Sequence, residues 1–244
     1  MNSIRLPRRA AAEFLGTALL ACIVIGSGVT AERLSDDHGI QLFTNTVACV
    51  LGLGLLIVVL GPVSGGHLNP LLSLADRMLG RSERSGLTRS DVAVYLLAQL
   101  LGAFSGMLLA AVMFQLPVAV SGADRVAPHT FVGELVAAAG LVFVFSSLAR
   151  ARQSLPVVAV TMAAYLGAAS WFTSSFGFLN PAITLARVFT DTYAGIAPAS
   201  ALLFIVAQLI GGAFGAVAAA ALFPGEPTAR RDEADEVMAI GIAA

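Results

Sequence analysis

The feature that most constrains this 244-residue chain is a set of six apolar segments, each long enough to cross a bilayer as a helix. A spanning helix needs about 20 mostly apolar residues. Hydrophobic residues make up 57% of the chain and charged residues only 12%, which is typical of an integral membrane protein and not of a soluble domain. The expected spans are 10–29, 42–60, 92–116, 130–149, 155–172 and 199–223. The sequence therefore predicts an all-α membrane protein with six transmembrane helices.

Two shorter stretches lie between the spans. Asn69-Pro70 follows the second segment, and Asn180-Pro181 follows the fifth. Asn is a preferred helix N-cap, and Pro fits the first helical turn because its missing N–H would be unbonded there. We expect half-helices at 69–79 and 180–190. Such short elements are tolerated at membrane depth only where they are buried in protein or line a water-filled cavity, so we interpret them as re-entrant.

The two halves of the chain repeat the same pattern. Glu13 of the first segment matches Glu134 of the fourth, and Gln99 of the third matches Gln208 of the sixth. Each half contains three spans and one half-helix, and because three is odd the second copy enters the membrane inverted. The expected units are a first repeat over 1–120, a second repeat over 121–224 and a cytoplasmic tail over 225–244.

Arginine placement predicts the orientation, because cytoplasmic loops carry an excess of basic residues. The chain has no lysine, so all 14 basic residues are arginines. Eleven fall on the side that holds both termini, and the other side holds three: Arg33, Arg125 and Arg187. We therefore expect both termini in the cytoplasm. The basic start also resembles a signal peptide, but the apolar run that follows is long enough to span and is echoed in the second half.

Composition also excludes several functions. A net charge of −1 offers no basic face for nucleic acid. Cys22 and Cys49 lie inside apolar runs, and we interpret them as buried free thiols, with a disulfide between spans or a two-cysteine metal site as less favoured alternatives. The sequence contains no nucleophile–base set and no metal-ligand cluster, so we expect neither enzymatic activity nor a cofactor.

These features together resemble the major intrinsic protein family, the aquaporins and aquaglyceroporins. The resemblance covers residues 10–223, and the motifs that carry it are 64–70 and 178–182. It implies an aquaporin-like fold in a lipid bilayer, assembled as a homotetramer. It also implies that Asn69 and Asn180 donate hydrogen bonds to a passing molecule, while Glu13 and Glu134 accept hydrogen bonds from the backbone that leads into the half-helices.

The resemblance predicts a passive channel for small uncharged solutes. Half-helix N-termini carry partial positive charge, and two of them meeting at the midplane exclude protons and cations while neutral molecules pass. Two alternatives remain open. Glu13 and Glu134 are intramembrane carboxylates and would serve as a relay in an ion-coupled transporter. Leu71 replaces the small Ala expected opposite Ala182, and its bulk would spread the two motifs. If it closes the pore, the chain would be a packing protein that conducts nothing.

The filter departs from the pattern of water-selective members. Those members place an Arg three residues after the second motif Asn, and here that position is Ile183. Counting from the motifs places Cys49, Ala168 and Gly177 at the other filter positions. None of the four is aromatic or charged, so we expect a wide, weakly polar constriction that admits molecules larger than water. A water-selective aquaporin is the alternative.

His67 and Arg187 complete the set of expected pore residues. We expect His67 to present backbone carbonyls to the pore and to pack its ring nearby; a pH gate at His67 is the alternative. Arg187 has two interpretations. It supplies a displaced positive charge at the outer mouth, or it complements the C-terminal end of the half-helix and pairs with Asp191 at i+4, which we favour.

The second motif also suggests a substrate. Residues 180–184 without the filter Arg look like a bacterial subgroup proposed to pass arsenite or related neutral metalloid acids. Thr184 stands where aquaglyceroporins commonly have Asp, so the pattern is not that of a plain glycerol channel. The expected solutes are glycerol-like polyols or neutral metalloid acids, and the expected location is the inner (plasma) membrane of a bacterium.

Overall fold

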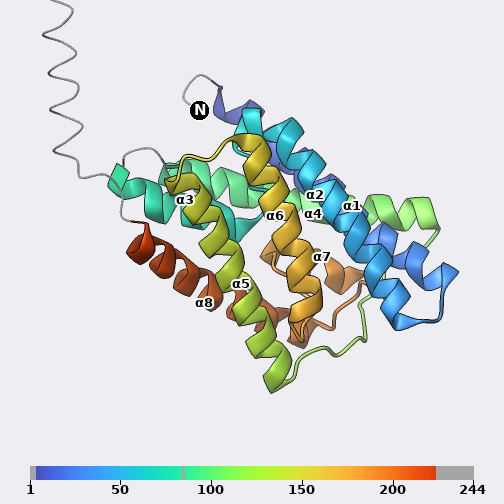
Figure 1. The fold of residues 1–244 in the computed structure, drawn as a ribbon. Coiled ribbons are helices and arrows are strands. Elements are labelled where there is room, and N and C mark those ends of the chain that lie inside the picture. The colour runs from blue at the N-terminus through green and yellow to red at the C-terminus, as the bar shows by residue number, and fades with distance from the viewer. Residues whose placement is uncertain (1–3, 84–85, 224–244) are drawn as a thin grey trace, which may run out of the picture.

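The computed structural model describes residues 4–83 and 86–223, and within these ranges it is all-helical. Six helices are apolar and long enough to cross a membrane, which confirms the expected fold class (Figure 1). They are α1 (Leu6–Leu34), α2 (His38–Ser64), α4 (Arg89–Phe114), α5 (Pro128–Arg150), α6 (Leu155–Phe172) and α8 (Pro198–Leu222). The expected tail over 225–244 lies outside the described residues.

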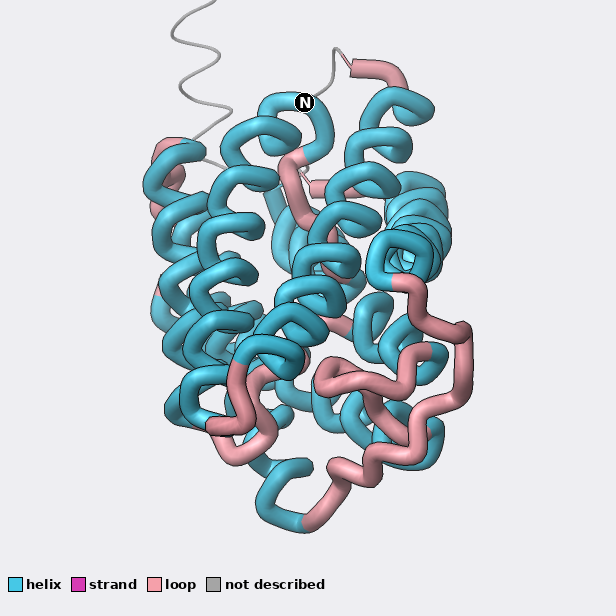
Figure 2. The backbone as a smooth tube through the Cα atoms, turned by 90° about the vertical axis from the view of Figure 1, so that its right-hand side faces the viewer, coloured by secondary structure: helices cyan, strands magenta, loops and turns pink. Residues whose placement is uncertain are grey.

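Two shorter helices begin at the two Asn-Pro pairs. Helix α3 covers Pro70–Glu83, and helix α7 covers only Pro181–Ala186 before the 3₁₀ turn η1 (Arg187–Phe189). The first half-helix is therefore longer than the expected 69–79, and the regular part of the second is shorter than the expected 180–190. Figure 2 shows the long helices gathered side by side, with loops concentrated at the ends of the bundle and non-helical segments between helices.

Each half of the chain contains one closely packed helix pair, and the two pairs are equivalent. Helix α1 packs on α4, and α5 packs on α8. A Cβ atom at Gly106 of α4 would collide with the carbonyl oxygen of Ala18, and one at Gly215 of α8 would collide with that of Ala139. In a membrane, small residues let helix backbones approach closely. These glycines therefore set the spacing of the two matching helix pairs.

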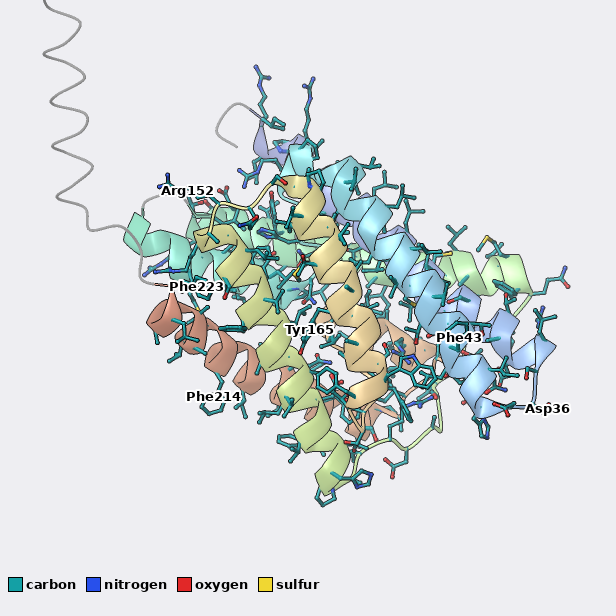
Figure 3. All side chains as sticks on the ribbon, in the orientation of Figure 1. Asp36, Phe43, Arg152, Tyr165, Phe214 and Phe223 are labelled. Carbon is teal, nitrogen blue, oxygen red and sulfur yellow. The ribbon has the colours of Figure 1, made fainter. Side chains whose placement is uncertain are left out.

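The outer surface of the bundle is apolar, as a lipid-facing surface must be. Phe43 on α2 and Phe214 on α8 are 58% and 61% exposed, and both lie at the periphery of the bundle (Figure 3). Some polar side chains within the bundle join helices to one another. The Tyr165 hydroxyl on α6 donates a 2.9 Å hydrogen bond to the Ala137 carbonyl on α5, which joins two neighbouring helices.

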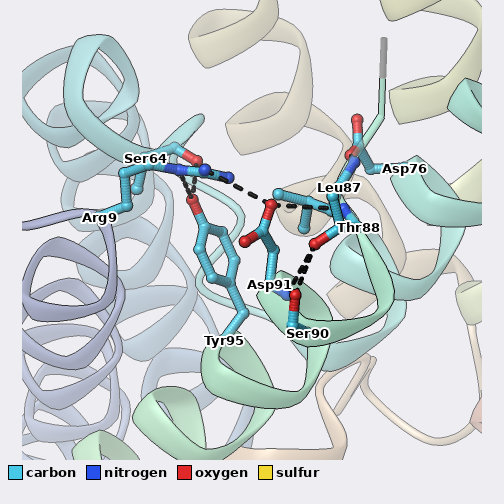
Figure 4. Close-up of polar contacts among 8 residues, drawn as sticks. All are labelled: Arg9, Ser64, Asp76, Leu87, Thr88, Ser90, Asp91 and Tyr95. Atoms are coloured by element: carbon cyan, nitrogen blue, oxygen red, sulfur yellow. Dashed lines mark hydrogen bonds and ion pairs between the residues drawn. The ribbon is translucent and has the colours of Figure 1, made fainter. Parts of the chain in front are cut away.

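A polar cluster holds the segment that leads into α3 (Figure 4). The buried Tyr95 hydroxyl on α4 donates to the Ser64 carbonyl at 2.7 Å, and Arg9 Nε on α1 donates to the same hydroxyl at 2.9 Å. Arg9 also lies 3.6 Å from a carboxylate oxygen of Asp91. The cluster joins α1, the end of α2 and the start of α4, so it fixes where the chain turns toward the first half-helix.

Candidate functional site

Each motif asparagine caps the helix that it starts. Asn69 Oδ1 accepts a hydrogen bond from Leu71 N at 2.9 Å. Asn180 Oδ1 accepts from Ala182 N at 3.1 Å and from Ile183 N at 3.3 Å. The side-chain oxygens thus satisfy backbone donors that would otherwise lack a partner at a helix N-terminus.

The amide nitrogens of the same two side chains join the half-helices. Asn69 Nδ2 donates to the Leu179 carbonyl at 2.9 Å, and Asn180 Nδ2 donates to the Leu68 carbonyl at 2.8 Å. Both asparagines line one cavity. Each Nδ2 carries two hydrogens, so each keeps one hydrogen beyond this reciprocal contact. The structure therefore brings both helix N-termini and both amide groups to one place.

The backbone just before each motif has an uncommon conformation. Leu68 and Leu179 have φ angles of 50° and 61°, in the left-handed region that non-glycine residues rarely adopt. Gly66 and Gly177 precede them with φ of 63° and 62°. The same conformation at equivalent positions of both halves shows that the segments turn in the same way. Such strained backbone persists only where the surroundings hold it.

Glu13 holds the first of these segments. Its carboxylate accepts from Ser64 Oγ at 2.6 Å, from the backbone N–H groups of His67 and Leu68 at 3.0 and 2.7 Å, and from Gln99 Nε2 at 2.7 Å. Glu13 is fully buried. A buried carboxylate with four donors is well compensated for its loss of water.

Glu134 holds the second segment with the same set of donors. It accepts from Ser175 Oγ at 2.9 Å, from the backbone of Phe178 and Leu179 at 2.7 and 3.1 Å, and from Gln208 Nε2 at 2.6 Å. This carboxylate is also fully buried and, like Glu13, does not line the cavity. The geometry is that of two equivalent backbone supports, and it favours this interpretation over a proton relay.

His67 lines the cavity, and its ring is held by neighbours. Nδ1 lies 3.1 Å from Ser73 Oγ. Tyr95 and Phe145 meet the imidazole edge-on, with centroid separations of 5.7 and 5.4 Å. His67 thus occupies a buried aromatic setting next to the first motif.

Leu71 does not separate the motifs, contrary to the concern raised by its size. Its side chain is buried and extends toward α8, where a Cβ atom on Gly212 would lie 3.5 Å from Leu71 Cδ2. Leu71 is therefore accommodated in ordinary packing contact with α8 beside Gly212. Ala182 is fully buried, and the hydrogen bonds between Asn69 and Asn180 segments remain in place.

The cavity that contains both asparagines has a volume of about 100 Å³. Three of the four expected filter residues lie on its wall: Cys49, Gly177 and Ile183. Much of the remaining wall is apolar, including Leu53 of α2 and Leu141 of α5. A cavity with two amide groups and many aliphatic wall residues suits a small neutral molecule with a few hydroxyl groups.

The prediction for Ala168 is wrong. Ala168 is exposed and does not line the cavity, and α6 instead contributes Leu166 and Ser170 on either side of it in sequence. Two residues correspond to about 200° of rotation around an α-helix. An error of two in counting back through the loop before Asn180 therefore moves the predicted residue to the opposite face.

Arg187 follows the C-terminal end of the half-helix as expected, but the ion pair expected with Asp191 is wrong. Arg187 and Asp191 do not form an ion pair, and Asp191 instead accepts from Ser121 Oγ at 3.3 Å and Gly122 N at 3.2 Å. The α-helix ends at Ala186, so the i+4 position is not on the same helix face. Arg187 lines the cavity, donates through Nε to the Ala194 carbonyl, and stacks with Cζ 3.5 Å from the Phe178 ring centroid.

Arg125 is a cavity residue that the sequence did not reveal. Its Cζ lies 5.8 Å from the centroid of the same Phe178 ring. Nε donates to the Gly195 carbonyl and Nη2 to the Tyr193 carbonyl, both at 2.6 Å. Arg125 comes from the loop before α5, 62 residues from Arg187 in sequence. The sequence indicated only that Arg125 lies on the side of the membrane with few arginines. That observation does not predict which residues Arg125 contacts.

Comparison with known proteins agrees with this geometry. The family model described as "Major intrinsic protein" matches residues 1–176. The chain is 42% identical over 213 residues to aquaglyceroporin AqpS of Rhizobium meliloti, across 86% of this chain and 88% of that protein. A probable glycerol uptake facilitator protein of Thermotoga maritima is 34% identical over 101 residues, which is 40% of each chain.

The fold has a counterpart among solved structures. The X-ray structure of the aquaglyceroporin from Plasmodium falciparum superimposes with a TM-score of 0.68, at 17% sequence identity, over 87% of this chain and 93% of that one. Three findings agree with one another: the family match over most of the chain, the long alignment with a bacterial aquaglyceroporin, and the six-span fold with two half-helices. The chain belongs to the major intrinsic protein family.

Proposed function

We propose that the protein is a passive channel for small uncharged solutes with a wide filter that lacks the usual Arg. The observation that carries this proposal is the reciprocal hydrogen bonding of Asn69 and Asn180 at one cavity. It gives a passing solute two amide donors and the N-termini of two helices. Ile183, in place of a guanidinium, leaves the wall beside them aliphatic.

Exclusion of cations follows from the opposed half-helices. A helix N-terminus carries the equivalent of roughly half a positive charge. Two such ends meet at the asparagines, so a cation or hydrated proton is repelled there, while a neutral molecule exchanges its water hydrogen bonds for those of the amides. Glu13 and Glu134 maintain this arrangement through the strained backbone that precedes each motif.

The proposed solutes are glycerol-like polyols and neutral metalloid acids such as arsenous acid. An aliphatic Ile183 and the small side chains at Cys49 and Gly177 favour molecules larger than water. The relatives named as aquaglyceroporin and glycerol uptake facilitator are in keeping with this class. We also propose a homotetramer in a bacterial plasma membrane, with both termini in the cytoplasm as the arginine distribution predicts.

Stopped-flow light scattering on proteoliposomes tests the proposal with four solutes: water, glycerol, urea and arsenous acid. The expected result is glycerol entry well above that of empty liposomes, without accumulation beyond equilibrium. Glycerol entry equal to that of empty liposomes, with water flux intact, would instead assign a water-selective channel. Accumulation driven by a pH or sodium gradient would reject a channel in favour of an ion-coupled transporter.

A further inference from the structure

The end of the cavity formed by Arg125, Phe178 and Arg187, here called the arginine end, has an unbalanced charge. Both guanidinium groups lie within 6 Å of the Phe178 ring centroid, at 5.8 Å for Arg125 and 3.5 Å for Arg187. The two guanidinium groups are close enough for their like charges to repel each other. An anion between them would relieve this repulsion.

The protein does not itself supply this anion. Among the described residues, neither guanidinium forms an ion pair, and all of their acceptors are backbone carbonyls, those of Tyr193, Ala194 and Gly195. The neighbouring carboxylates are engaged elsewhere. Glu134, whose charge acts on Arg187, accepts hydrogen bonds from four other donors. Glu32 accepts from Tyr193 N at 3.2 Å, and Asp124 accepts from Ser200 Oγ at 2.6 Å.

Unused donors remain on both arginines. Within the part of the chain that the structure describes, the two Nη groups of Arg187 and Nη1 of Arg125 donate to no acceptor. Both residues line the cavity. Thr46 lies on the same wall, is 7% exposed, and has a buried hydroxyl with no partner among the described residues. Several donors of the kind that oxyanions prefer therefore surround one space.

We propose that the arginine end binds a small monovalent anion, held by the free Nη groups of Arg125 and Arg187. The anion is bound there and does not continue inward, because the half-helix presents Ile183 one turn before Arg187, followed by an aliphatic wall. A neutral solute loses little on that wall, whereas an anion that leaves the guanidinium groups loses its charge-assisted hydrogen bonds. Bound anion then competes with neutral solutes for entry.

Nitrate is a suitable probe, because it is small, planar and monovalent. The thermal unfolding midpoint of the purified full-length protein is measured against nitrate concentration, with sodium gluconate keeping the ionic strength constant. A ligand that binds only the folded state raises the midpoint in a saturable way. We expect saturable stabilisation of the wild-type protein, and slower glycerol entry into proteoliposomes over the same nitrate range.

Variants assign the site. Arg187→Gln and Arg125→Gln each remove charge-assisted hydrogen bonds and should weaken nitrate binding by on the order of tenfold to a hundredfold. Arg33→Gln is the matched control, since Arg33 also stacks on a phenylalanine, at 5.4 Å, and bonds a carbonyl oxygen, but does not line the cavity. It should bind nitrate like the wild type. If Arg187→Gln does not fold, Arg187→Lys is the second variant. It keeps the positive charge but removes the planar guanidinium and its paired N–H donors, and it should also weaken nitrate binding.

Two results would overturn the proposal. One is the lack of any saturable nitrate effect on the wild-type unfolding midpoint. The other is an effect that survives in both arginine variants, which would place the anion elsewhere. The unfolding measurement does not depend on transport, so a protein that binds nitrate but passes no glycerol would refute the proposed function and leave the anion site standing.

Discussion

Replacing Glu134 by glutamine tests the support of the second half-helix, and the hydrogen bonds set the size of the effect. The carboxylate accepts from Ser175 and Phe178 through Oε1, and from Leu179 and Gln208 through Oε2. A glutamine has one oxygen and one NH₂ group. The hydroxyl and the amide partners can reorient, but the backbone cannot, so one backbone N–H faces the new NH₂ group. One buried unpaired donor costs about 1–3 kcal/mol.

The assay is SDS denaturation of the protein in mixed micelles, followed by circular dichroism, together with glycerol flux. We expect Glu134→Gln to lower the free energy of unfolding by about 1–3 kcal/mol and to reduce flux, because the segment before Asn180 loses its fixed conformation. Ser175→Ala is the matched control, since it removes one donor and keeps both backbone bonds. A Glu134→Gln variant as stable as wild type, with unchanged flux, would refute the support role.

Three further predictions concern the cavity wall and the motif junction. Ile183→Arg should reduce glycerol flux more than water flux in stopped-flow assays. If both fluxes equal those of the wild type, Ile183 does not form the constriction. Mercuric ion should block glycerol flux by binding the cavity thiol of Cys49, so Cys49→Ser should abolish the block while Cys22→Ser, away from the wall, retains it. Gly212→Val should crowd Leu71 and destabilise the protein by about 1–3 kcal/mol, and adding Leu71→Ala should restore part of that loss, which a double-mutant cycle measures.

Local sequence predicted the six spans and the starts of both half-helices because each depends on residues that are close in sequence. Apolar length defines a spanning helix, and an Asn-Pro pair defines a helix start. Cys49 was placed correctly on the cavity wall by an ungapped count from Asn69, since the chain between them is mostly one continuous helix. The same count failed for Ala168, where a non-helical loop intervenes before Asn180.

The arginine end was not predictable because it depends on long-range contacts and on where a helix stops. The pairing expected for Arg187 assumed a helix that continues to Asp191, but the α-helix ends at Ala186 and a 3₁₀ turn follows. Arg125 reaches the same ring from a loop in the middle of the chain. The surroundings of Leu71 likewise include Gly212, a residue 141 positions away that becomes its neighbour only once α8 packs against α3.

Under the proposed function, cation exclusion and solute size selection depend on different parts of this cavity. The usual filter Arg combines a narrow opening with a positive charge, and here the two are separated. We propose that size is set at Ile183, which carries no charge. Positive charge is found one turn away at Arg187, roughly 5–6 Å along the half-helix axis, and again at the helix ends that meet at Asn69 and Asn180. Because the helix ends persist whatever side chain occupies position 183, widening the filter does not require a loss of cation exclusion.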